Sequence, residues 1–172
     1  MKLYHTSSVV IRDPDIYRGR KNADFGQGFY LTPDLDFARR WAFADAVINV
    51  YELDESGLLL QRLERDEQWY RYIFQNRRSC DEWNADVVIG PIANDTIFDT
   101  LGIITSGFLD PSEALKLLMI GPEYVQVAVK TEKAVSQLRW TGSERVERFD
   151  EKQLKEEQRE YQRQFAEAMS RM

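Results

Sequence analysis

The sequence predicts an α+β fold with strands and helices around one core, and two segments carry this prediction. Residues 124–130 alternate between valines and other side chains, which is the period of a strand with one buried face. Residues 29–45 change from a short apolar run to helical spacing, and the turn Thr32-Pro33-Asp34 between them is typical of a helix start. A single domain that contains both kinds of element therefore fits the chain.

The other elements follow from composition and spacing along the chain. We expect further strands over residues 2–4, 47–53 and 86–89, which carry β-branched, aromatic or other apolar side chains. We expect further helices over residues 65–77, 94–101 and 111–119, the last of which begins with Pro111.

The C-terminal segment differs in composition from the rest of the chain. From about Thr141 it is highly charged, with one weak apolar stripe at Leu154, Tyr161, Phe165 and Met169. We therefore expect a domain over residues 1–140 and a charged C-terminal helical extension over residues 141–172. The extension either lies on the domain or docks a partner.

Composition excludes several classes of protein. The 172 residues, 43% of them hydrophobic, suffice for one self-supporting core. Because Cys80 is the single cysteine and His5 the single histidine, we predict no internal disulfide and no metal site. The sequence contains no apolar run near the roughly 18–20 residues that cross a bilayer and no signal-peptide pattern at its start, so we expect a cytoplasmic protein without membrane partners. A net charge of −6 argues against broad capture of nucleic acid.

The segment Gly26-Gln27-Gly28 does not fit the common nucleotide-binding motifs. It lacks the third glycine of the dinucleotide fingerprint, and it precedes a strand instead of linking a strand to a helix. The chain also contains no GxxxxGK[ST] phosphate loop and no GxSxG elbow. A Rossmann fold, an NTPase and a serine hydrolase are therefore disfavoured.

Taken together, three segments resemble a known NAD-binding core. These are Leu3-Tyr4-His5-Thr6-Ser7, then Phe25-Gly26-Gln27-Gly28-Phe29-Tyr30-Leu31-Thr32, then Ala38 and Trp41. Their order and spacing resemble the ADP-ribosyltransferase superfamily, in its branch of diphtheria toxin and poly-ADP-ribose polymerases. The same residues are similar to a bacterial family of uncharacterised proteins in that clan with an Asp-Phe-Gly-x-Gly-Phe-Tyr-Leu-Thr motif. The resemblance covers residues 2–140, and the first 45 carry its specific motifs.

The resemblance implies an α+β fold with a split, mostly antiparallel β-sheet core and surrounding helices that enclose an NAD cleft. His5 would hydrogen-bond a ribose hydroxyl, and the backbone of Thr6 would pair with the nicotinamide carboxamide. Tyr30 would stack on the nicotinamide ring, and Trp41 either closes the other side or is a core residue of its helix. Ser7, Phe25, Gly26 and Gly28 belong to the segments that would bind the cofactor.

A departure from the superfamily occurs on the strand at residues 124–130. The resemblance implies a catalytic glutamate here, and Gln126 occupies the position. An amide can hold a ribose hydroxyl, but it cannot accept a proton or supply a full negative charge. Elongation of an ADP-ribose polymer is therefore not expected, whereas single transfer and hydrolysis of NAD both stay open.

Other polar residues have two interpretations each. Asn94 and Asp95, which follow Gly90-Pro91, either bind NAD at the cleft mouth or cap a helix. The pair Arg77-Arg78 either meets a phosphate group or favours the dipole at a helix end.

The function implied is mono-ADP-ribosyl transfer from NAD to an intracellular protein or nucleic acid, with His5, Tyr30 and Gln126 as catalytic residues. A toxin with a neutralising partner protein is the cellular context that the resemblance suggests. The alternatives are an NAD glycohydrolase and a catalytically inactive module that binds NAD or ADP-ribose.

Overall fold

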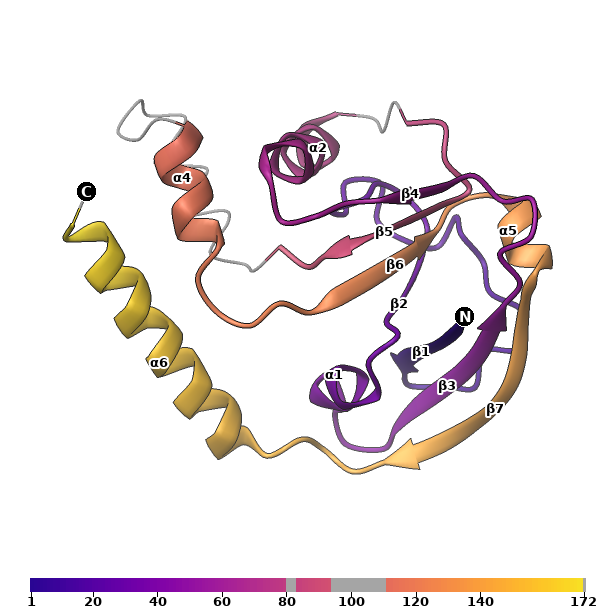
Figure 1. The fold of residues 1–172 in the computed structure, drawn as a ribbon. Helices are drawn as coiled ribbons and strands as arrows, with labels where there is room; N and C mark the ends of the chain where they lie inside the picture. Colours follow the sequence, from indigo (N-terminus) through magenta and orange to yellow (C-terminus); the bar gives the residue numbers. More distant parts are fainter. Residues whose placement is uncertain (80–82, 94–110, 172) are drawn as a thin grey trace.

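The computed structural model of the chain describes residues 1–79, 83–93 and 111–171 and has the α+β fold that the sequence predicts (Figure 1). Its strands are β1 Lys2–Ser7, β2 Phe29–Leu31, β3 Ala46–Leu53, β4 Leu60–Arg62, β5 Val87–Pro91, β6 Val125–Val129 and β7 Leu138–Val146. Its helices are α1 Leu35–Arg40, α2 Glu67–Arg78, α4 Pro111–Leu118, α5 Glu132–Ser136 and α6 Glu151–Met169. No helix in the described ranges is both long enough and apolar enough to cross a bilayer.

The strands form two mostly antiparallel sheets, as expected for a split sheet core. One sheet has the order β1-β3-β7, and the other has the order β2-β6-β5-β4 with β4 and β5 parallel. An isolated antiparallel bridge between Tyr4 of β1 and Thr32, just after β2, connects the two sheets. The backbone hydrogen bonds of this bridge are 2.8 and 2.9 Å long. Beyond the bridge β1 continues with its register to β3 unchanged.

The alternation on β6 places its side chains in two different cores. Val127 and Val129 are fully buried between the two sheets, together with Leu3 and Tyr51. Ala128 points to the opposite face, where it packs in a second core whose members include Trp69 and Ile73 of α2. Gln126 shares the face of Ala128, as the sequence predicts, because side chains two residues apart on a strand point the same way. The fold therefore has three layers: α2, the four-stranded sheet and the three-stranded sheet (Figure 1).

The start of α1 differs in detail from the prediction. Asp34, and not Thr32, is the N-cap, and its carboxylate accepts from the backbone of Asp36 and Phe37. Thr32 instead donates its hydroxyl to the carbonyl of Val125 at 2.9 Å, which ties the end of β2 to β6. The helix expected over residues 94–101 lies outside the described residues.

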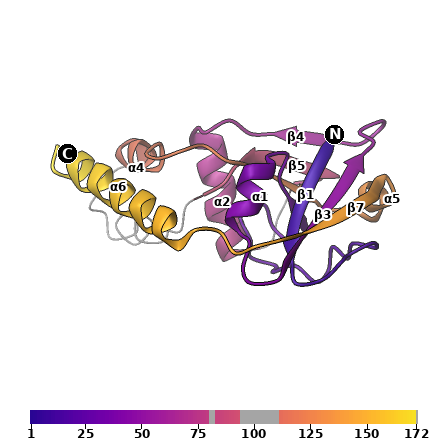
Figure 2. The ribbon, with the colours of Figure 1, turned by 90° about the horizontal axis from the view of Figure 1, so that it is seen from below.

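The charged C-terminal segment is only partly helical. Residues 141–146 belong to β7, which pairs with β3, and the helix begins at Glu151 with Asp150 as its N-cap. The sequence did not reveal this strand because its outward positions are charged. The two views agree that α6 lies beside α4 at one end of the molecule (Figures 1 and 2). Arg40 of α1 forms an ion pair with Glu157, which fixes α6 to the domain.

Candidate functional site

A cleft of about 390 Å³ opens where β1, β2 and the end of α1 meet. Five of the predicted site residues line it. They are His5 and Thr6 of β1, Tyr30 of β2, Trp41 at the end of α1 and Gln126 of β6. They come from four elements and from positions as far apart as 5 and 126. The fold therefore brings these five predicted residues to one place.

The split between the sheets determines where the backbone of Thr6 points. Tyr4 uses both its N–H and its C=O in the bridge to Thr32, so these groups point away from β3. In an antiparallel strand, residues two apart direct their backbone groups to the same side. The N–H and C=O of Thr6 therefore also point away from β3, toward the cleft that Thr6 lines. The Thr6 hydroxyl donates to the carbonyl of Ala38 at 2.6 Å and holds α1 beside β1.

His5 is a neutral histidine with a defined tautomer. Burial lowers the pKa of its ring below the ordinary value of 6.5, although a hydrogen bond to the Tyr30 backbone opposes the shift. Its Nδ1 lies 2.7 Å from the carbonyl oxygen of Tyr30, which can only accept, so Nδ1 carries the proton. Nε2 of the neutral ring is then a hydrogen-bond acceptor. The ring also packs on Phe29, with 4.4 Å between the ring centroids.

Tyr30 holds the glycine turn that precedes its own strand. Its hydroxyl donates to the carbonyl of Gly26 at 2.6 Å and accepts from the backbone N–H of Phe25 at 2.9 Å. Gly26 has φ of 75°, a conformation that glycine adopts without steric strain. A Cβ on Gly28 would lie 2.7 Å from the backbone oxygen of Val129, so the close approach of β2 to β6 requires glycine there too. The motif around Tyr30 thus shapes a turn.

Trp41 is a surface residue and not part of the core, so of its two interpretations the core interpretation is wrong. Its side chain is 62% exposed and contacts the edge of Phe37, with 5.8 Å between centroids. Phe37 in turn stacks on Tyr124 at 4.3 Å. An exposed indole supported from one side leaves ring surface available for stacking.

Gln126 lies within a hydrogen-bonded group of charged residues. Its Nε2 donates to Oδ2 of Asp24 at 3.3 Å. Oδ1 of Asp24 accepts from Nε and Nη2 of Arg77 at 2.8 and 2.6 Å, and both side chains of this ion pair are at least 86% buried. Asp24 and Arg77 also line the cleft, and an exposed arginine, Arg20, completes its polar wall.

Four other predicted cofactor-binding residues, Ser7, Phe25, Gly26 and Gly28, are not among the residues that line this cleft. Ser7 is engaged in a loop contact, where it donates to the carbonyl of Val9 and accepts from the buried Asn49. Phe25 is fully buried in the core beside α2. Gly26 allows the backbone conformation of the turn and Gly28 allows the close approach of β2 to β6, as described above. Asn94 and Asp95 lie outside the described residues.

Sequence reasoning missed Asp24 and Arg20 as cleft residues. Asp24 directly precedes the glycine turn, which is a local signal, but its partners are 53 and 102 residues away in the chain. Within the described residues no group of three or more histidine, cysteine, aspartate or glutamate side chains could hold a metal ion.

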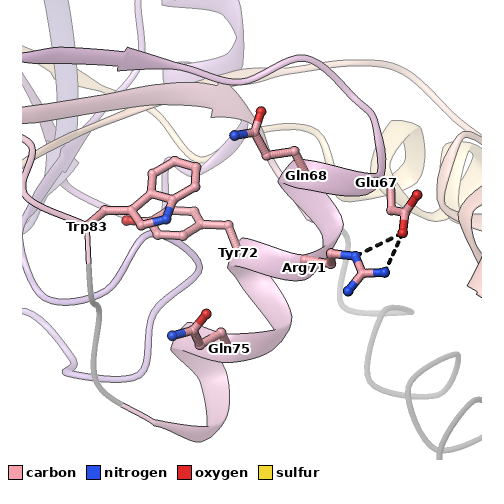
Figure 3. Close-up of a pocket in the computed structure, with 6 residues that line it drawn as sticks. All are labelled: Glu67, Gln68, Arg71, Tyr72, Gln75 and Trp83. Atoms are coloured by element: carbon pink, nitrogen blue, oxygen red, sulfur yellow. Dashed lines mark hydrogen bonds and ion pairs between the residues drawn. The ribbon is translucent and has the colours of Figure 1, made fainter.

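A second hollow of about 360 Å³ lies on one face of α2 (Figure 3). It is lined by Glu67, Gln68, Arg71, Tyr72, Gln75 and Trp83. The rings of Tyr72 and Trp83 stack with 3.8 Å between centroids, and Glu67 pairs with Arg71 at 2.6 Å. Its side chains come from a single helix and Trp83, and none is a predicted site residue. The cleft between the sheets is therefore the stronger candidate for the functional site.

Two comparisons with known proteins bear on the chain. The sequence profile of one protein family, described as "Protein of unknown function (DUF3990)", matches residues 1–140. No curated protein matches the chain. The matched range contains every described residue that lines the cleft, whereas α6 lies beyond it.

Proposed function

The chain belongs to the DUF3990 family, and we propose that it binds NAD in the cleft between its sheets and transfers ADP-ribose to a macromolecular acceptor. One observation carries this proposal: His5, Thr6, Tyr30, Trp41 and Gln126 line a single cleft. These are the residues to which the resemblance to ADP-ribosyltransferases assigns the nicotinamide and its ribose. The cleft volume of about 390 Å³ is also within the usual range of small-molecule sites.

The chemistry of the cleft walls suits nicotinamide. The backbone N–H and C=O of Thr6 can pair with the C=O and NH₂ of a carboxamide, because a carboxamide offers one acceptor and one donor in the same plane. Tyr30 and the exposed Trp41 provide aromatic walls, and a cationic pyridinium ring is attracted to such faces. The guanidinium of Arg20 is available for a phosphate of the same ligand.

The proposed reaction breaks the bond between C1′ of the ribose and the nicotinamide nitrogen. The bonding electrons pass to the nitrogen, which neutralises the pyridinium, and an oxocarbenium-like ribose remains. His5 accepts a hydrogen bond from a ribose hydroxyl at Nε2, and Gln126 accepts one at its amide oxygen. The acceptor attacks C1′ and releases its proton to solvent.

The cleft restricts the acceptors that can react. The described residues that line it include one carboxylate, Asp24, and this group is already occupied by Arg77 and Gln126. Asp24 is therefore not available as a general base for a weak nucleophile, and in the proposed complex Nε2 of His5 is used by the ribose hydroxyl. We propose that the acceptor is a group that is nucleophilic without help, and that the chain acts in the cytoplasm as a toxin with a neutralising partner.

Incubation of the purified chain with labelled NAD and a cell lysate tests the proposal. Label that becomes covalently attached to a macromolecule supports transfer. Release of free ADP-ribose and nicotinamide in equal amounts identifies an NAD glycohydrolase. Binding of NAD without turnover identifies an inactive module, and no binding contradicts the proposal.

Replacement of Trp41 by alanine tests whether this exposed ring contacts the ligand. We expect the dissociation constant for NAD to rise roughly 2- to 10-fold, because stacking contributes about 0.5–1.5 kcal/mol beyond burial. The melting temperature should change little, since the side chain is 62% exposed. Tyr17→Ala is the control, because Tyr17 is similarly exposed and does not line the cleft. Equal NAD affinity of the Trp41→Ala variant and the parent in calorimetry would remove Trp41 from the site.

The lone histidine gives a pH dependence that can be assigned to one residue. The pKa of His5 is lowered by folding, so as pH falls below 6.5 the unfolded chain binds a proton that the folded chain does not. We expect the free energy of unfolding to decrease as pH falls from 6.5 to the lowered pKa, and to be independent of His5 above 6.5. Denaturant titrations of the parent and of His5→Asn across this range measure the difference, and parallel pH curves would contradict a buried neutral His5.

A further inference from the structure

The carboxylate of Asp24 is fully used by its neighbours. Oδ1 accepts both hydrogen bonds from Arg77, and Oδ2 accepts from the backbone N–H of Ala93 and from Nε2 of Gln126, each at 3.3 Å. Asp24 is itself anchored to α2, because Asn76 donates to its backbone carbonyl at 3.0 Å. The carboxylate is therefore held in place from two sides before any ligand enters.

An amide side chain has a donor end and an acceptor end, and Asp24 distinguishes them. A carboxylate that is ion-paired with arginine can only accept, so the NH₂ end of Gln126 must face it. The oxygen Oε1 is then the end that is left for the cleft that Gln126 lines. Among the described residues, none donates a hydrogen bond to Oε1.

We infer that Asp24 is the positioning residue of the site, and that it fixes the amide of Gln126 with its oxygen toward the ribose. This inference rests on the proposed function. It explains how a glutamine can occupy the position of a glutamate: the fixed amide oxygen accepts a hydrogen bond from a ribose hydroxyl, as a carboxylate oxygen would. Arg77 keeps the group neutral as a whole, so the cleft does not contain an uncompensated buried charge.

The same geometry predicts that Gln126→Glu alone does not improve NAD cleavage. Gln126→Glu would put a second carboxylate about 3.3 Å from Asp24, with Arg77 as the shared partner. Two carboxylates at this distance cannot both be charged without strong repulsion. The resemblance alone would suggest that Gln126→Glu improves NAD cleavage, whereas the presence of Asp24 makes this single change unfavourable.

Exchanging the carboxylate and the amide between positions 24 and 126 tests the inference. In Asp24→Asn the new amide still offers an oxygen to Arg77, but it presents NH₂ to Gln126, which turns over and directs its own NH₂ into the cleft. The same change leaves the N–H of Ala93 without its acceptor and Arg77 without a carboxylate, so the melting temperature of the variant is measured beside kcat. We expect kcat for nicotinamide release to fall about tenfold, the effect of one lost hydrogen bond, with KM for NAD within about twofold of the parent. The double variant Asp24→Asn with Gln126→Glu should recover most of kcat, because the amide introduced at position 24 donates to one glutamate oxygen and leaves the other for the ribose.

The outcomes separate positioning from a merely structural role. Asp36→Asn is the control, since Asp36 is an exposed aspartate paired with Arg39 outside the cleft, and it should leave kcat unchanged. A folded double variant that is no faster than Asp24→Asn would overturn the inference. A recovery of kcat that only follows a recovery of the melting temperature would overturn it too, since Gln126→Glu also returns a carboxylate to the group around Arg77.

An NMR measurement in the absence of NAD tests the positioning of Gln126 independently of the proposed function. In the NMR spectrum of the parent, one side-chain N–H of Gln126, assigned by its loss in Gln126→Ala, should be shifted by its bond to the carboxylate. The shift should disappear in Asp24→Asn. If the parent shows this shift but does not act on NAD, the proposed function fails and the positioning of Gln126 stands. An unshifted amide in the parent overturns the positioning itself.

Discussion

Gln126→Ala is expected to lower kcat for nicotinamide release about 100-fold, the size of effect seen when one group that stabilises a transition state is removed. The loss should be in kcat, with the dissociation constant for NAD changed less than about threefold, because the contact with the ribose hydroxyl strengthens as positive charge develops at C1′. Alanine introduces no buried charge, and Gln126 is only partly buried, so the fold should remain intact.

Single-turnover measurements of nicotinamide release, with NAD affinity from calorimetry, measure this effect. Gln68→Ala is the matched control, because it removes the same side chain from an exposed position on α2 outside the cleft. The effect should exceed that of Asp24→Asn, which turns the amide over but leaves it in the cleft. Full turnover in Gln126→Ala would exclude Gln126 as a catalytic residue, whatever the position of its side chain.

The sequence predicted the parts of the site that depend on local pattern. The alternation of Val125, Val127 and Val129 determined which face of β6 carries Gln126, and this prediction is confirmed. The helix after β2 was predicted from its turn and spacing, and its end presents Trp41. The direction of the Gln126 side chain follows from the period of one strand, which neighbouring residues reveal. The exposure of Trp41 does not follow from helical spacing, because Trp41 lies just after the end of α1.

The parts that the sequence did not predict depend on distant contacts or on charge. Asp24 acquires its role from Arg77 and Gln126, which only the fold brings together. β7 was not recognised because its exposed positions carry charges such as Arg139 and Glu144, which hide the alternation of a strand at the edge of a sheet. Single residues also have two interpretations until burial is known, as Trp41 illustrates.

Tyr30 is expected to give two separable effects, one from its hydroxyl and one from its ring. In Tyr30→Phe the carbonyl of Gly26 and the N–H of Phe25 lose their partner, and Phe25 is fully buried. Leaving such groups unpaired costs about 2 kcal/mol of unfolding free energy. For a chain of this length that corresponds to a melting temperature lower by roughly 4–8 °C. The aromatic wall of the cleft is kept in this variant.

Tyr30→Ala removes the ring as well and should weaken NAD binding by about a further tenfold relative to Tyr30→Phe, since an aromatic wall of the nicotinamide site is lost. The comparison is made between these two variants because both lack the hydroxyl, so a damaged glycine turn affects them alike. Calorimetric melting of both variants measures the change in melting temperature, and NAD titration measures the change in NAD affinity. A Tyr30→Phe variant with the melting temperature of the parent would show that the hydroxyl does not hold the turn. Equal NAD affinity of the two variants would show that the ring of Tyr30 does not contact the ligand, and the proposed position of the nicotinamide would then be wrong.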